Sequence, residues 1–157
     1  MTAIQLEDIV FPAIISILAA YQLGNFARAV GKQRAKHKIK PPATTGEPSF
    51  ERALRAQQNT VEFMPMFLSA LWVDALFFNP VISFVIGLVY LYARHQYFAS
   101  YVEDAEKRMP PFKLCVKMLQ ILLVQSCLGI TQCLLLKYAG FNLKETVFSV
   151  LPFKPPV

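Results

Sequence analysis

The hydrophobic positions of this chain gather in four long runs instead of alternating along it. Each run reaches the roughly 20 residues that a membrane-spanning helix needs once its polar end is included. The runs are too long and too uniformly apolar for the strands of a membrane barrel. The pattern predicts an all-α integral membrane protein in which one domain, residues 1–157, holds four transmembrane helices at about 6–34, 49–78, 81–107 and 112–138 and a tail at 139–157.

Proline-containing segments separate the runs. Residues 40–48 contain three prolines and a glycine, so they cannot continue a helix and predict the first connection. We expect Ser49 to cap the second helix. Residues 79–80 (Asn-Pro) predict a short turn, and residues 109–111 (Met-Pro-Pro) predict the connection between the third helix and the fourth.

Charge sets the expected orientation. Charged residues make up 17% of the chain, against about 25% in soluble proteins, and the net charge is +6. The basic residues are confined to short segments next to the apolar runs, which argues against nucleic acid as a partner. The positive-inside rule then places residues 28–55 and 94–117 in the cytosol and both termini in the lumen. Because no basic region precedes the first run, we expect that helix to be retained.

The cysteines and histidines predict neither a disulfide framework nor a metal site. Cys115, Cys127 and Cys133 lie in one apolar stretch and are odd in number. His37 and His95 have no partner at metal-ligand spacing. Asp74 lies inside the second apolar run, where a carboxylate is costly. We consider two interpretations of Asp74, a functional group in the membrane and a side chain that reaches the lumenal interface.

Two stripes of polar residues mark the cytosolic ends of the second and third helices. They are Arg55, Asn59 and Glu62 on the second, and Arg94, Tyr97, Tyr101 and Arg108 on and after the third. Residues at these spacings share a helix face, so the stripes can meet at one membrane depth. Arginine pairs bind carboxylates and a glutamate binds an ammonium group, which suits a zwitterionic ligand with excess negative charge. The alternative is that these arginines and tyrosines only anchor helix ends at the interface.

Three segments resemble the membrane-associated eicosanoid and glutathione metabolism (MAPEG) family. They are residues 41–46 (PPATTG), 50–65 (FERALRAQQNTVEFMP) and 87–98 (GLVYLYARHQYF). The resemblance implies a homotrimer in the endoplasmic reticulum membrane and nuclear envelope, with glutathione as co-substrate between subunits and a lipid substrate in the intersubunit groove. It places Arg108 beside the glutathione thiol as the catalytic residue. The implied glutathione contacts are Arg34, Arg55, Gln57, Asn59, Glu62, Arg94, Tyr97 and Tyr101.

The activity that the resemblance implies is conjugation of glutathione to a lipid electrophile such as leukotriene A4, the leukotriene C4 synthase reaction, with glutathione peroxidase activity beside it. Phe63 and Ala35 depart from the pattern of the leukotriene-forming members, which have tyrosine and arginine there, so a broader transferase activity is the other option. The alternative function is a non-catalytic scaffold that binds arachidonate and activates 5-lipoxygenase. A transporter is disfavoured because no helix is broken midway and no repeat is present.

Overall fold

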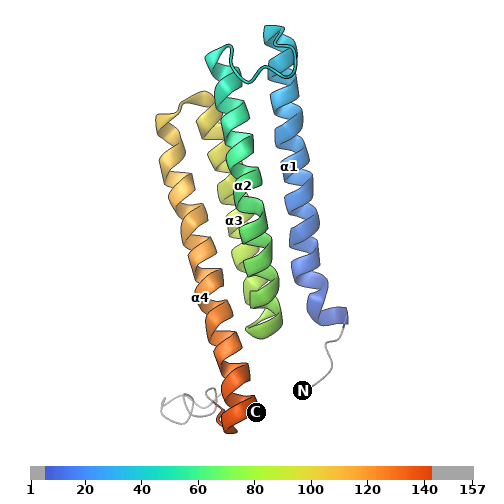
Figure 1. The fold of residues 1–157 in the computed structure, drawn as a ribbon, viewed down its shortest axis with the longest axis vertical. Coiled ribbons are helices and arrows are strands. Elements are labelled where there is room, and N and C mark those ends of the chain that lie inside the picture. The colour runs from blue at the N-terminus through green and yellow to red at the C-terminus, as the bar shows by residue number, and fades with distance from the viewer. Residues whose placement is uncertain (1–5, 143–157) are drawn as a thin grey trace.

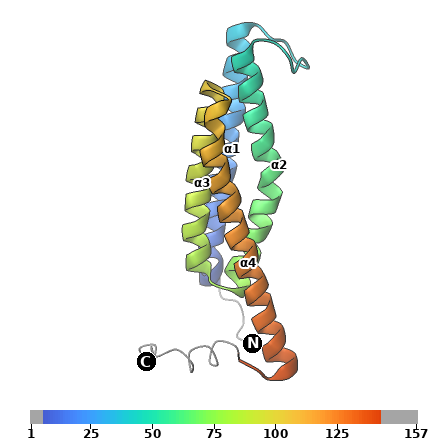
Figure 2. The same cartoon turned by 90° about the vertical axis from the view of Figure 1, so that its left-hand side faces the viewer.

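The computed structural model describes residues 6–142, and these residues form an antiparallel bundle of long helices (Figures 1 and 2). The chain runs alternately up and down, and α3 packs against α1, α2 and α4. Most of the predicted tail, residues 143–157, lies outside the described part. The long helices are α1 (Val10–His37), α2 (Pro48–Phe77), α3 (Pro80–Glu103) and α4 (Met109–Ala139), with short 3-10 turns η1 (Leu6–Ile9) before α1 and η2 (Glu106–Arg108) before α4.

The start of α2 differs from the predicted capping by Ser49. Glu47 is the N-cap, with its backbone extended, and its carboxylate accepts hydrogen bonds from the backbone N–H and the hydroxyl of Ser49. Pro48 occupies the first helical position, where its missing N–H costs nothing. The glutamate therefore takes the capping role because the proline that follows it fixes where the helix begins.

Helix α3 is shorter than predicted and α4 begins earlier. The sequence predicts a third helix up to residue 107, but Asp104 is extended, with φ −150° and ψ 130°, and ends α3. Residues 110–111, predicted to be a loop, lie in the first turn of α4. Proline is tolerated in a first turn because those N–H groups have no partner within the helix. Helix α1 also differs at its C-terminus. It continues beyond the predicted end at residue 34 and stops only where Lys38 adopts a left-handed conformation (φ 55°).

The bundle core is apolar and contains stacked rings. Phe67 of α2 and Tyr90 of α3 stack with their centroids 3.8 Å apart, surrounded by Ile15 and Leu122 from the other two helices. Gly129 lets α4 approach the end of α2, because a Cβ at this position would lie 2.5 Å from the carbonyl oxygen of Phe77. These contacts join all four helices into one bundle.

Asp74 lies in the last turn of α2 with its side chain inside the bundle, and both interpretations of it stay predictions. The side chain is fully buried, and one carboxylate oxygen accepts a 2.6 Å hydrogen bond from the Ser83 hydroxyl of α3. The other oxygen, Oδ1, has no hydrogen-bond partner within residues 6–142. The carboxylate turns toward α3 because Ser83 offers a donor there.

The outer surface of the bundle is apolar. Large side chains such as Ile17 and Val124 are 72% and 59% exposed, as expected of helices that face lipid. Three segments are long and apolar enough to cross a membrane, namely Val10–His37, Pro48–Phe77 and Glu106–Ala139. Helix α3 falls outside this group, so the fourth predicted crossing stays a prediction.

Candidate functional site

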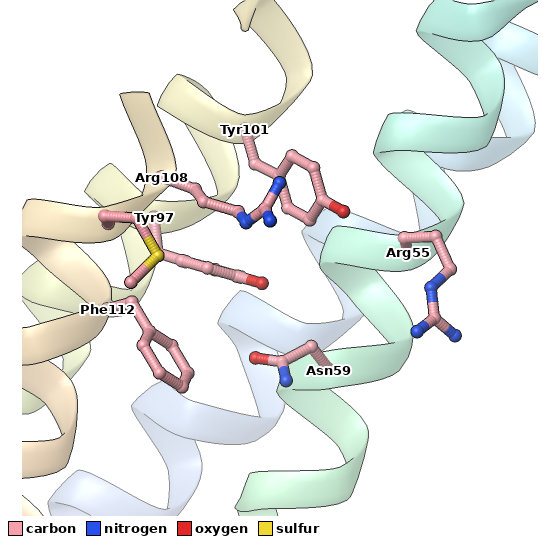
Figure 3. Close-up of a pocket in the computed structure, with 7 residues that line it drawn as sticks. Arg55, Asn59, Tyr97, Tyr101, Arg108 and Phe112 are labelled. Carbon is pink, nitrogen blue, oxygen red and sulfur yellow. The ribbon is translucent and has the colours of Figure 1, made fainter. Parts of the chain in front are cut away.

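A cavity of about 310 Å³ opens between α2, α3 and the start of α4 (Figure 3). It lies at the end of the bundle that carries the α1–α2 connection and η2, which we call the basic end (Figure 1). The cavity is lined by Arg55, Asn59, Tyr97, Tyr101, Arg108, Met109 and Phe112. Five of these residues belong to the two stripes that the sequence singled out, and the fold brings the stripes together.

Helical spacing explains how the stripes reach one cavity. Arg55 and Asn59 are four residues apart on α2, and Tyr97 and Tyr101 are four residues apart on α3, so each pair lies on one helix face. The two tyrosine rings pack edge to face with centroids 5.7 Å apart. Arg108 comes from η2, where the chain turns back toward α4. The break after α3 therefore adds Arg108 to the cavity lining, beside the pairs from α2 and α3.

Arg108 is positioned by its own turn and by an aromatic ring. Its Nη1 donates a 3.0 Å hydrogen bond to the carbonyl oxygen of Ala105, and its guanidinium carbon lies 4.8 Å from the centroid of the Tyr101 ring. The side chain is half-buried and forms no ion pair with any residue that the structure describes. A half-buried guanidinium without a carboxylate partner is available to an anionic ligand.

Arg94 lies behind the cavity, does not line it, and is completely buried. Its Nη1 donates a 2.8 Å hydrogen bond to Oδ1 of Asn59, and its Nε donates one of 3.1 Å to the hydroxyl of Tyr90. Its guanidinium carbon lies 4.4 Å from the centroid of Phe63 and 5.4 Å from that of Tyr97. Nη2 has no hydrogen-bond partner among the described residues. The buried cation thus connects α3 directly to a cavity residue of α2.

The remaining predicted contacts do not line the cavity of this single chain. Gln57 is half-buried and Glu62 is exposed, and neither lines the cavity. Arg34 on α1 donates a 2.7 Å hydrogen bond to the carbonyl oxygen of Ala43 and stacks on Phe50, 4.6 Å from the ring centroid. Arg34 therefore holds the α1–α2 connection in the structure.

Arg55 lies at the cavity's outer edge. Its side chain is exposed, and in Figure 3 its guanidinium points away from Tyr101 and Arg108. Its hydrogen bond to the side-chain oxygen of Gln58 is long, at 3.3 Å. The cavity is therefore open on the α2 side, where this side chain has room to move.

Sequence reasoning missed the apolar wall of the cavity. Met109 and Phe112 contribute to it from the first turn of α4. The Phe112 ring lies 5.8 Å from that of Tyr97 and 5.7 Å from that of Phe63. The signal was available, because Phe112 follows Arg108 by one helical turn. A loop at residues 109–111 would break this periodicity, but the two prolines lie in the first turn of α4 and preserve it.

The lining combines hydrogen-bond donors with aromatic rings. Two arginines, an asparagine and two tyrosines line a space with no lining carboxylate, and the Arg55 guanidinium lies at its outer edge. Such a site favours an anion over a cation. No cluster of three or more His, Cys, Asp or Glu side chains arranged to hold a metal occurs within residues 6–142.

Comparisons with known proteins agree on one family. The MAPEG family model matches residues 11–128. Microsomal glutathione S-transferase 2 of Homo sapiens is 47% identical over 133 residues, which cover 85% of this chain and 90% of the relative. The enzyme of the same name from Mus musculus is also 47% identical, with the same coverage. Leukotriene C4 synthase of Cavia porcellus is 36% identical over 124 residues, covering 79% of this chain and 83% of the relative.

The matched residues include most of α1, all of α2 and α3, and the part of α4 that borders the cavity. The cavity therefore lies within the region that defines the family, and the resemblance noted in the sequence is confirmed. The chain belongs to the MAPEG family.

Proposed function

We propose that this protein is a membrane-bound glutathione transferase that conjugates glutathione to a lipid electrophile. The names of its relatives and the anion-binding character of the cavity support this proposal. The observation that carries it is Arg108, a half-buried guanidinium on the cavity wall without an acidic partner in the described residues. Glutathione has two carboxylates, one ammonium group and a thiol, which matches a site rich in cationic donors.

In the proposed mechanism, Arg108 stabilises the glutathione thiolate. A free thiol has a pKa of about 8.5, so only a small fraction is ionised at neutral pH. A nearby permanent cation lowers that pKa and increases the thiolate fraction. With an epoxide substrate the sulfur forms a bond to carbon while the carbon–oxygen bond breaks, and the alkoxide takes a proton from water. The product is a hydroxy thioether.

The glutathione carboxylates would bind Arg55 and the donors beside it. Asn59 already accepts a hydrogen bond from Arg94 through its oxygen, so its NH₂ group is the part that remains to donate to a ligand. Tyr97 and Tyr101 present hydroxyl groups on the opposite side, from α3. These donors would fix the peptide so that its thiol reaches Arg108.

We propose that a homotrimer completes the site. Arg34, Gln57 and Glu62 lie outside the cavity of one chain, and Arg55 borders its open side. A neighbouring copy that supplied Arg34 and Gln57 would close that side and form a groove for the lipid. We further propose that the trimer resides in the endoplasmic reticulum membrane and nuclear envelope, with four crossings per chain and both termini lumenal.

Substitution of Arg108 tests the mechanism. The purified protein, Arg108→Ala and Arg108→Lys would be assayed for conjugation with leukotriene A4, an aryl halide and, for peroxidase activity, a lipid hydroperoxide. We expect Arg108→Ala to lose conjugation, to bind glutathione still, and to assemble normally by size-exclusion chromatography. We expect Arg108→Lys to recover part of the rate because it restores a cation. Unchanged turnover in Arg108→Ala would refute the role of this residue.

The substrate panel separates the finer alternatives. Turnover of leukotriene A4 alone indicates a dedicated synthase, whereas turnover of the aryl halide as well indicates a broad transferase. A protein that binds arachidonate but no glutathione in equilibrium dialysis would be the non-catalytic scaffold, and that result would overturn the proposal.

A further inference from the structure

A second hollow lies between α1 and α3, on a part of the surface that shares no lining residue with the cavity. Its volume is about 650 Å³, within the range of ligand-binding pockets. Most of its lining is apolar, including Leu18, Phe26, Leu88 and Phe98. We call it the α1–α3 groove. An open apolar groove of this size on a lipid-facing surface is suited to a hydrocarbon chain.

The two ends of the groove differ in polarity. Leu18 and Leu88 line the half nearer the middle of the bundle, whereas the half nearer the basic end contains Asn25 and His95 beside the apolar Phe26, Ala29 and Phe98. Between them Gln22 donates a 2.8 Å hydrogen bond to the carbonyl oxygen of Leu91, while its own side-chain oxygen is buried without a partner in the described residues. The groove is therefore mainly apolar, with a few polar groups toward the basic end.

A row of cations continues the groove along α1. Lining residues Leu18, Gln22, Asn25 and Ala29 repeat at spacings of four, three and four residues, and the next positions in this pattern are 32 and 36. At about 100° per residue all six positions lie within roughly 40° of one direction on the helix. Both of the added positions are exposed lysines. Lys32 and Lys36 thus extend the face that forms the groove.

These cations have no acidic partner in the part of the chain that the structure describes. Arg28 flanks the same face and is also exposed without an ion pair. On α3, Glu103 is already paired with Lys107, with 2.5 Å between the charged atoms. Three unpaired cations around one helix face give a local excess of positive charge, which favours an anionic group above the groove.

We propose that the α1–α3 groove binds an anionic phospholipid, with one acyl chain in the groove and the phosphate against Lys32, Lys36 and Arg28. The arrangement suits this lipid in two respects. The apolar hollow would hold the acyl chain, and the unpaired cations that follow it along α1 would hold the phosphate. Basic residues at the membrane surface attract anionic lipids by about fivefold per charge. The basic end is also the end expected to face the cytosol, where anionic lipids are enriched. The proposal does not depend on glutathione chemistry.

Lipid retention tests the charge part of the proposal. The full-length protein would be delipidated and exposed to phosphatidylserine, phosphatidylcholine or oleate, and bound lipid would be counted by native mass spectrometry. The test variant is Lys32→Gln with Lys36→Gln. The matched control is Lys113→Gln with Lys117→Gln, which removes two exposed lysines at the same spacing near the start of α4. We expect the test variant to weaken phosphatidylserine binding about 25-fold and the control to leave it unchanged.

Three results would overturn the proposal. An equal loss in both double variants would show non-specific attraction to a basic surface. Equal retention of phosphatidylcholine would show that the cations play no part, and preferential retention of oleate would assign the groove to a free fatty acid. Conjugation activity, measured in parallel, reports on the cavity and keeps the two proposals separate.

Photo-cross-linking tests the groove part. A benzophenone amino acid at position 88, a residue that lines the groove and is 40% exposed, would react with whatever lies there. We expect cross-links to phosphatidylserine in vesicles that contain it. A cross-link to a second copy of the chain would show that protein covers this face and would exclude the lipid.

Discussion

Replacing Arg94 by methionine tests whether the buried guanidinium acts on the ligand through Asn59. The arginine does not line the cavity, yet its Nη1 lies 2.8 Å from Oδ1 of Asn59, which does. We expect the amide to lose its fixed orientation in the variant and to bind glutathione less well. Methionine is close to arginine in length and contacts aromatic rings favourably, so it fills the space between Phe63 and Tyr97.

The magnitude follows from the bond that is removed. A hydrogen bond from the charged donor is present with and without glutathione, so what binding loses is the hydrogen bond that the oriented Asn59 amide donates to the ligand, about 0.5–1.5 kcal/mol, or about 2-fold to 13-fold in binding. The loss of this bond in folding is offset, because methionine also removes a buried charge whose Nη2 has no partner in the described residues. The expected result is therefore a higher glutathione dissociation constant with a small change in melting temperature.

The assay is a double-mutant cycle with Asn59→Ala. Glutathione binding would be measured by equilibrium dialysis for the unaltered protein, both single variants and the double variant. If Arg94 acts through Asn59, the methionine substitution should have little further effect once Asn59 is alanine. Arg52→Met is the matched control, because Arg52 also links α2 to α3, through a 3.0 Å hydrogen bond to the carbonyl oxygen of Val102, but does not border the cavity.

Two outcomes would refute this reasoning. Additive losses in the cycle would mean that Arg94 contacts glutathione directly, as the family resemblance implies. An equal loss in Arg52→Met would mean that any weakened link between α2 and α3 disturbs the site, so that the effect of Arg94 would not be specific to Asn59.

The remaining predictions concern the fold. Gly129→Ala should lower stability by about 1–3 kcal/mol in thermal denaturation, because its Cβ would meet the last carbonyl of α2. Gly31→Ala is the control and should not lower stability, because open space surrounds that position. Equal effects of the two substitutions would contradict this prediction. The hydrogen bond from Ser49 lowers the pKa of the Glu47 carboxyl group. The ionised carboxylate should therefore stabilise the first turn of α2 above the ordinary carboxyl pKa, and this stabilisation should be lost as the pH falls through the lowered value. Amide exchange in that turn should show this loss, and Glu47→Gln should abolish the pH dependence. Asp74→Asn should raise the melting temperature, because it removes a buried carboxylate with one unpaired oxygen in the described residues; a decrease would indicate that the charge is needed.

Much of the fold was predictable because lipid imposes simple rules on sequence. The apolar runs and the segment at 79–80 located all four helices to within a few residues, since proline and charge rarely occur inside a span. Helix ends were less predictable. Glu47 caps α2 in place of Ser49, and the two prolines at 110–111 begin α4, because first-turn geometry depends on which N–H groups need partners.

The site was predictable only as far as single helices determine it. Periodicity placed Arg55 with Asn59 and Tyr97 with Tyr101, and the fold unites these pairs in one cavity. Periodicity did not distinguish Arg94 from its neighbours, although Arg94 is buried behind the cavity. That distinction depends on which partner meets each side chain across the α2–α3 contact, which the spacing within one helix does not contain.

The burial of Arg94 also bears on how many helices cross the membrane. Helix α3 is 24 residues long, enough for a crossing, but Arg94, His95 and Gln96 lower the mean hydropathy of its second half. A hydropathy average counts every side chain as though it met lipid. Arg94 does not, because it is fully buried among aromatic rings, and the Gln96 amide donates a 3.0 Å hydrogen bond to the Tyr92 hydroxyl one turn away. Arg94, which lowers the mean hydropathy of α3 more than any other residue of the helix, is thus hidden from lipid by the fold. A crossing by α3 is therefore compatible with the same arginine that supports the cavity.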